Sequence, residues 1–287
     1  MKHIFLIYHP AVIFTYICSA IVCSMLTMQP FFVLISFAVG SIYSIYLSGV
    51  RKYFSSLKFM LVVFAVIAVA NPLFNHKGST VLFYIGNNPF TWEALLFGIC
   101  SGGMLLCVIV WFRCYQALMT NDKFLYLFGK AAPTSALVAS MILKWIPQTS
   151  HKMNQIRNAQ AALYKNHDDG TRKRKIASSV RMTGILMSWS MEDSIEAADS
   201  MRARGYGAKK RTTFSKYKMG MHDIVSLCII AALAAVSIAV ILGRANDFLF
   251  YPTPSGADLA AWLYVPYALL LLYPLILEGR ERLRWMR

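Results

Sequence analysis

Apolar residues in this chain gather in six long runs that are separated by polar gaps. The runs cover residues 10–28, 31–49, 57–74, 93–114, 221–242 and 259–277. Each is close to the ~20 residues that an α-helix needs to cross a hydrocarbon core of about 30 Å. The pattern therefore predicts an all-α integral membrane protein with about six transmembrane helices.

The long interval 115–218 between the fourth and fifth runs follows a different, amphipathic pattern. It predicts two helices, from about residue 134 to 164 and from about 178 to 204, with a polar break and the basic run 172–175 between them. The apolar stretch 133–147 is short for a span and carries Lys144, so we interpret it as the membrane-skimming start of the first helix. The predicted domains are 1–114 with four spans, 115–218 with the amphipathic helices, and 219–287 with a transmembrane hairpin and a basic tail.

The second amphipathic helix carries one apolar stripe and a basic end. Its stripe consists of residues spaced by three or four positions, namely Val180, Gly184, Met187, Met191, Ile195, Ala198 and Met201. We expect Gly205 to cap this helix, with Arg202 and Arg204 beside its negative end. Because methionine faces adapt to a partner and arginine binds carboxylates in a bidentate manner, the same features favour docking of another protein.

Charge supports a membrane topology. Only 15% of the 287 residues are charged, against about 25% in soluble domains, and 29 Lys and Arg outnumber 13 Asp and Glu. The basic residues concentrate near 51–58, in 144–218 and in the tail, whereas 75–92 and 243–258 carry only Lys77 and Arg244. The positive-inside rule then places both termini and the central interval in the cytoplasm. Since topology accounts for the basic surplus, we expect the lipid bilayer and not nucleic acid as a partner.

The predicted spans show little chemistry. Glu93 and Arg113 lie at the ends of the fourth run, where snorkelling explains these ionisable residues. In the same run Gly98, Gly102 and Gly103 indicate close helix packing. The six cysteines and six histidines lack metal-ligand spacing, and no phosphate-binding loop or nucleophile elbow occurs. We therefore expect no catalytic residue, metal or cofactor, and a membrane part that serves as a platform.

The run Ala203-Arg204-Gly205-Tyr206-Gly207 resembles the second Ala-Arg-Gly motif of the transmembrane T component of energy-coupling-factor (ECF) transporters. This family includes the Q subunit of cobalt and nickel importers. Three further stretches resemble family patterns in the same order: Ser48-Gly49-Val50-Arg51, Asn71-Pro72-Leu73-Phe74 and Lys144-Trp145-Ile146-Pro147. The resemblance covers roughly residues 10–221.

Two features depart from the family pattern. The first Ala-Arg-Gly motif is degenerate: Ala159, Gln160 and Ala162 match it, but Leu163 and Tyr164 stand where the family has arginine and glycine. The final run 259–277 also goes beyond the commonest family outline.

The resemblance implies a non-catalytic subunit of an ABC importer in a bacterial or archaeal cell membrane. Two cytoplasmic ATPase subunits would bind and hydrolyse ATP, and a small membrane S component would capture a vitamin or transition-metal ion. This chain would dock the ATPases through Ala203, Arg204 and Gly205 and transmit their motion to the S component.

Two other classes of function stay open. One is a secondary carrier or membrane enzyme, which polar residues gathered at midplane depth would support. The other is a membrane scaffold or anchor that recruits cytosolic partners without transport. Co-purification with two ATPases and a small hydrophobic protein would separate all three.

Overall fold

The computed structural model describes residues 5, 8–75, 78–85, 88–129, 131–163, 172–208, 217–244, 248–251 and 261–285. The chain forms two compact units, Met1–Phe124 with Tyr217–Arg287, and Leu125–Lys216. We call them the spanning unit and the crossed-helix unit, and describe each by itself.

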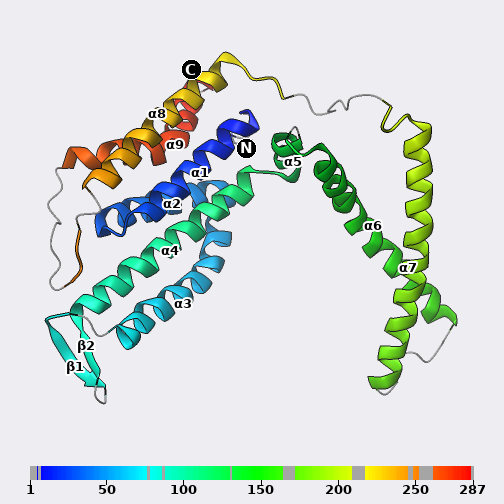
Figure 1. Cartoon of the computed structure of the whole chain (residues 1–287), viewed down its shortest axis with the longest axis horizontal. Helices are drawn as coiled ribbons and strands as arrows, with labels where there is room; N and C mark the ends of the chain where they lie inside the picture. The colour runs from blue at the N-terminus through cyan, green and yellow to red at the C-terminus, as the bar shows by residue number, and fades with distance from the viewer. Residues whose placement is uncertain are drawn as a thin grey trace. The chain divides into compact units, whose positions relative to one another are not determined.

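Long apolar helices make up the spanning unit (Figure 1). They are α1 (Pro10–Leu26), α2 (Pro30–Ser48), α3 (Val50–Phe74), α4 (Trp92–Leu118), α8 (Met221–Arg244) and α9 (Val265–Trp285), the last preceded by a 3₁₀ turn at Ala261–Tyr264. Five segments are long and apolar enough to cross a membrane, and α1 is a shorter apolar helix of the same kind. At 17 residues, α1 is at the lower limit of what spans a bilayer. The prediction of an all-α integral membrane protein is confirmed.

A single glycine separates α2 from α3. Gly49 has a φ of 83°, in the region that residues with a Cβ rarely adopt. Its N–H donates to the Ile45 carbonyl at 2.9 Å, and its own carbonyl accepts from the Tyr53 N–H at 3.2 Å. The glycine therefore ends one helix and starts the next in the Ser48-Gly49-Val50-Arg51 stretch.

Small residues bring α4 close to its neighbours, as the sequence predicted. A Cβ at Gly98 would lie 2.8 Å from the Ala68 carbonyl oxygen of α3, and one at Gly103 would lie 2.9 Å from Val33 of α2. Because neither contact leaves room for a methyl group, these glycines set the distance between the helices.

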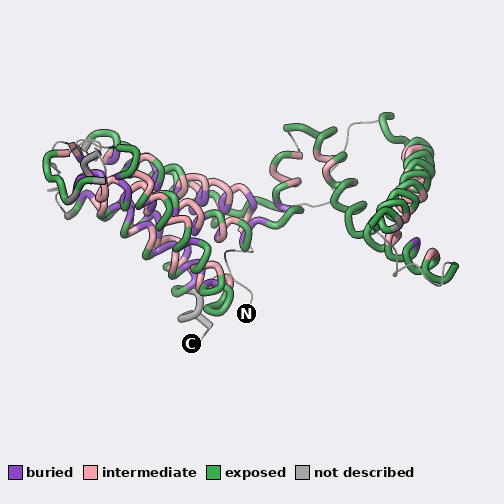
Figure 2. The backbone as a smooth tube through the Cα atoms, turned by 90° about the horizontal axis from the view of Figure 1, so that it is seen from below, coloured by how far each residue is buried: buried purple, intermediate pink, exposed green. Residues whose placement is uncertain are grey.

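A hydrogen-bonded network ties four helices of the spanning unit together in its core. Ser36 Oγ of α2 lies 2.7 Å from Ser24 Oγ of α1 and accepts from Trp111 Nε1 of α4 at 3.0 Å. Ser24 Oγ is in turn 3.2 Å from the hydroxyl of Tyr267 on α9. Figure 2 shows buried residues recurring along these helices. Their polar groups thus satisfy one another inside the bundle.

Two elements were missed by the sequence analysis. The interval 75–92, expected to be a plain loop, contains an antiparallel hairpin of β1 (Val81–Ile85) and β2 (Asn88–Thr91), with Val81 opposite Thr91 and Ile85 opposite Asn88. A further helix, α5 (Asn121–Gly129), follows α4.

The crossed-helix unit is built on α6 (Pro133–Leu163) and α7 (Arg172–Ala203). α6 continues through Pro147. The expected start of α7 near residue 178 was wrong, because the basic run belongs to its first turns. Arginine and lysine are strong helix formers, and this propensity outweighs their unfavourable position at a helix N-terminus.

Candidate partner-docking site

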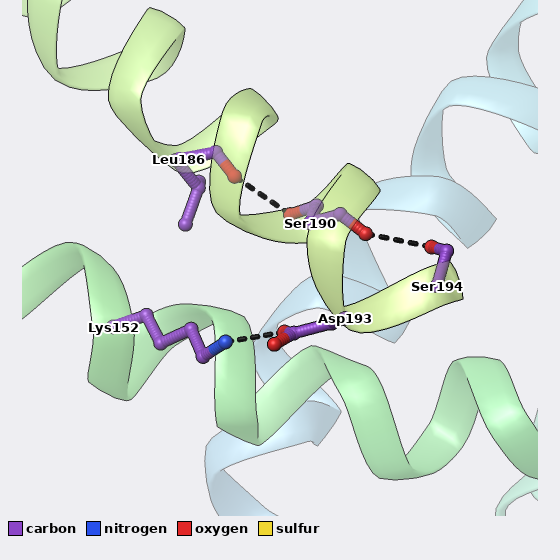
Figure 3. Close-up of polar contacts among 5 residues, drawn as sticks. All are labelled: Lys152, Leu186, Ser190, Asp193 and Ser194. Carbon is purple, nitrogen blue, oxygen red and sulfur yellow. Dashed lines mark hydrogen bonds and ion pairs between the residues drawn. The ribbon is translucent and has the colours of Figure 1, made fainter. Parts of the chain in front are cut away.

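An ion pair fixes the point at which α6 and α7 cross (Figures 1 and 3). Lys152 Nζ of α6 donates to the carboxylate of Asp193 on α7. The same ammonium lies 5.4 Å from the centre of the Trp189 ring. Ile156, one turn further along α6, is only 5% exposed. One lysine therefore provides the polar contact of the crossing, and Ile156 is buried one turn away from it.

Hydroxyl groups on α7 are satisfied by the helix itself. Ser190 Oγ donates to the Leu186 carbonyl at 2.8 Å, and Ser194 Oγ donates to the Ser190 carbonyl at 2.6 Å (Figure 3). Ser179 and Thr183 bond to the preceding turn in the same way. Because these hydroxyls already have an acceptor, they do not require water, and the helix surface remains compatible with an apolar partner.

The predicted apolar stripe of α7 is exposed over most of its length. Val180 and Met187 are each 66% exposed, Met191 64% and Ile195 65%. Ala198 and Met201, nearer the end of the helix, are half-buried. Large exposed apolar strips of this kind mark interaction surfaces.

The end of α7 is a Schellman cap, as predicted for Gly205. Gly205 has a φ of 77°. Its N–H donates to the Arg202 carbonyl at 2.9 Å, while the Tyr206 N–H donates to the Met201 carbonyl, also at 2.9 Å. These paired bonds satisfy carbonyls that the helix end would otherwise leave free.

The candidate docking residues lie on this cap. Arg202, Ala203, Arg204 and Gly205 are all exposed. Within the described part of the chain, neither arginine forms an ion pair with an acidic side chain. Both positions suit the negative end of the helix, and both guanidinium groups remain accessible to a partner.

The degenerate first motif lies at the end of α6. Ala159 and Ala162 are exposed, Gln160 is half-buried, and Leu163 is 74% exposed; Tyr164 lies outside the described residues. Each motif follows the crossing by about ten residues, or about 15 Å along its own helix. Figure 1 shows the two helix ends diverging from the crossing, so the structure presents two separate tips.

The explanation of Glu93 by snorkelling was wrong. Glu93 is 1% exposed. Its carboxylate accepts from the Thr80 hydroxyl at 2.7 Å, from the Thr80 N–H at 3.1 Å and from the Ser79 hydroxyl at 3.1 Å. It lies in the first turn of α4, where the helix dipole also favours a negative charge. The residue fastens the β-hairpin to the helix.

The spanning unit contains two further ionisable residues, Arg113 and Glu278. Arg113 is half-buried and donates to the Lys52 carbonyl at 3.4 Å, with its guanidinium 5.8 Å from the Tyr53 ring centre. Glu278 directly follows the predicted run 259–277; it lies within α9 and is 2% exposed. Neither of its carboxylate oxygens has a hydrogen-bond partner among the described residues. The spans therefore contain a buried carboxyl group that the sequence analysis missed.

A buried lysine follows α4. Lys123 of α5 is 6% exposed, and its ammonium donates to the Leu118 carbonyl at 3.4 Å. Burial lowers the pKa of Lys123. The described residues contain no group of three or more His, Cys, Asp or Glu side chains placed to hold a metal ion.

The chain is similar in sequence to a transporter subunit. No family model matches it. It is 24% identical over 222 residues to EcfT, the energy-coupling factor transporter transmembrane protein of Streptococcus thermophilus, with 70% of this chain and 82% of that protein covered. Over 120 residues it is 30% identical to the MG181 homolog of Mycoplasma pneumoniae and 29% identical to MG181 of Mycoplasma genitalium, both uncharacterised. The chain covers only 27% and 28% of the length of these two proteins.

Proposed function

We propose that this chain is the energy-coupling transmembrane subunit of an ECF-type importer. The similarity to EcfT carries the proposal, because it extends over 82% of that protein. In this role the chain docks two cytoplasmic ABC ATPases and passes their ATP-driven motion to a small membrane S component. The S component binds the substrate, a vitamin or a transition-metal ion. The chain itself is not an enzyme and needs no cofactor, since ATP is bound by the partner subunits.

The crossed-helix unit supports this role. Its two diverging tips suit docking to two partner molecules at once, and the pinned crossing lets force on one tip act on the other. Arg204 is expected to pair with a carboxylate in an ATPase groove, with Ala203 and Gly205 allowing close approach of the backbone. Leu163 at the other tip is expected to pack against an apolar surface.

The charges and the relatives support a location in the cell membrane. We expect the bacterial cell membrane, because the three similar proteins come from bacteria. Both termini and the crossed-helix unit are expected on the cytoplasmic side, where the positive-inside rule places their basic residues.

Arg204→Ala tests the proposal against simple helix capping. A lost cap interaction costs about 0.3–1 kcal/mol. A desolvated ion pair that loses one partner costs about 3–5 kcal/mol, equivalent to a loss of roughly a hundredfold or more in affinity. We expect purified Arg204→Ala protein to stay monodisperse in detergent but to lose its ATPases. Arg204→Lys should recover only part of the affinity, because an ammonium cannot make the bidentate contact.

Arg202→Ala is the matched control, since Arg202 lies on the same cap but outside the motif. Equal and mild effects at both positions would favour capping and contradict the docking role of Arg204. The scaffold alternative predicts association with cytosolic proteins but no uptake. The carrier and enzyme alternatives predict activity of the chain without ATPases. Retained uptake by cells lacking the ATPases would support them.

A further inference from the structure

A cavity of about 460 Å³ opens in the spanning unit where α1 ends and α4 begins. Its lining comes from the last turn of α1, the turn that leads into α2, Phe97 of α4 and the segment 248–251. Phe97 lies about one and a half turns into α4, so the cavity is near the end of the spanning helices. Its volume is within the range of sites for small organic ligands.

Aromatic rings form one wall of this cavity. The centre of the Phe97 ring lies 5.2 Å from that of Phe250 and 6.1 Å from that of Tyr251, and the Phe248 and Phe250 rings are 4.7 Å apart. None of the described lining residues is Lys, Arg or His. Ring faces carry negative partial charge and attract cations.

Two polar atoms of the lining residues have no hydrogen-bond partner in the part of the chain that the structure describes. Gln29 is 1% exposed, and its Nε2 donates to the Tyr264 hydroxyl at 3.0 Å. Its Oε1 has no hydrogen-bond partner among the described residues, and the same is true of the Tyr251 hydroxyl. A buried carbonyl oxygen without a donor costs about 1–3 kcal/mol. A ligand with N–H groups would remove that penalty.

A carboxylate lies near the cavity. The buried carboxylate of Glu93 lies within electrostatic range of Tyr251, and burial followed by this carboxylate raises the pKa of Tyr251. The phenol therefore stays protonated at neutral pH and offers a hydroxyl oxygen as an acceptor. In the described part of the chain, no basic side chain forms an ion pair with Glu93.

We infer that this cavity binds the primary ammonium group of an amphiphile. The ammonium would donate to Gln29 Oε1 and the Tyr251 hydroxyl and lie against the aromatic wall. The apolar part of the ligand would contact Met25 and Met28. An anion is disfavoured, because it would lie against aromatic faces and the Gln29 carbonyl oxygen, with a carboxylate nearby. The ammonium group has two possible sources, the ethanolamine headgroup of a phospholipid or a soluble alkylamine.

Native mass spectrometry of the delipidated full chain tests the inference. We expect lysophosphatidylethanolamine to bind about tenfold more tightly than lysophosphatidylglycerol, which has the same tail but no ammonium. Tyr251→Phe, which keeps the ring, and Gln29→Leu should each lose most of this preference. Phe59→Leu is the control, because Phe59 is an aromatic residue of α3 that is 67% exposed and lies outside the cavity.

A competition arm separates the two sources. Displacement of the bound lysolipid by millimolar hexylammonium would support an ammonium site that takes soluble amines, and a retained lysolipid preference without displacement would support a lipid headgroup. Equal binding of the two lysolipids by the native chain would overturn the inference. An unchanged preference for lysophosphatidylethanolamine in Tyr251→Phe protein would also overturn it. This variant leaves the buried Gln29 side chain in place, so a change in folding would not explain the result.

Discussion

At the scale of single residues, opposite effects are expected at two glycines, one within α7 and one in the cap that follows it. Gly184 lies within the helix and Gly205 has a φ of 77°, and a Cβ would meet nothing within 4 Å at either position. A methyl group would therefore clash with no neighbour at either position, and only the backbone conformation distinguishes the two glycines. Gly184→Ala should stabilise α7 by about 0.5–1 kcal/mol, whereas Gly205→Ala should destabilise its end by about 1–2 kcal/mol.

Amide hydrogen exchange of the full chain in detergent measures both effects. The last turn of α7 should exchange faster in Gly205→Ala protein, and the middle of α7 should exchange more slowly in Gly184→Ala protein. Gly205→Asn should lie between Gly205→Ala and the native chain, because asparagine tolerates the left-handed conformation. Equal protection in Gly205→Ala and the native chain would argue against the Schellman cap.

Leu163→Arg tests the second tip. Because Leu163 is 74% exposed, the substitution should leave the chain itself folded. In the proposed complex it would bring a charge into an apolar contact without a partner, which costs at least 1–3 kcal/mol, or about tenfold or more in ATPase affinity. Pull-down of the ATPases measures this loss, with Leu163→Met as the control that keeps an apolar side chain. Native affinity in Leu163→Arg protein would mean that this position faces solvent in the complex.

Residue roles were predictable where backbone geometry decides them and not where burial does. Gly205 could be identified as a cap, since few residues other than glycine adopt its conformation. The burial of Glu93 could not, because it depends on Ser79 and Thr80 folding back over the start of α4. Glu278 was missed for a related reason: a run of apolar residues shows where a span is, but not how far its helix continues beyond the last of them.

At the scale of elements, the crossing of α6 and α7 depends on Lys152. Its side chain is 20% exposed and that of Asp193 39%, so solvent screening limits the pair to about 0.5–1 kcal/mol. Lys152→Met and Asp193→Asn should each speed amide exchange around the crossing by about two- to fivefold. Their double variant should show less than the sum, because the two changes remove one shared interaction.

Lys173→Met is the control for this cycle, because Lys173 is an exposed lysine of the same unit far along α7 from Asp193. Strict additivity of the Lys152 and Asp193 effects would show that the pair does not couple the helices. In that case the Trp189 ring and Ile156 would hold the crossing without it.

Helices were predictable from apolar periodicity, whereas the hairpin was not. The spans and the two amphipathic helices were found, because each repeats one pattern over many turns, but their ends differ from the predicted ones by up to eight residues. β1 has only five residues, too few to show a period, although its content of Val, Phe, Tyr and Ile is typical of strands. The early start of α7 was missed because the basic run has no apolar periodicity. Only the helical propensity of its arginines and lysines indicates a helix there.

At the scale of the whole molecule, two independent features mark opposite ends of the spanning helices: clusters of basic residues and the β-hairpin. Arg51 and Lys52 follow the α2–α3 junction, and Arg280 is near the end of α9. The β-hairpin lies between the other ends of α3 and α4. Since consecutive spans alternate direction, the basic ends and the hairpin belong to opposite faces of the membrane, whichever face is cytoplasmic.

Cysteine labelling decides which face is which. In a cysteine-free background, Glu196→Cys on α7 and Tyr84→Cys on β1 are both at exposed positions, Tyr84 being 68% exposed. The positive-inside rule predicts that an impermeant maleimide labels Tyr84→Cys in intact cells and reaches Glu196→Cys only after permeabilisation. Exposure is matched, so a difference in labelling reports the side of the membrane and not local burial. Labelling of Glu196→Cys in intact cells would put the crossed-helix unit outside, away from any ATP-bound ATPase, and would contradict the proposed coupling role as well as the topology.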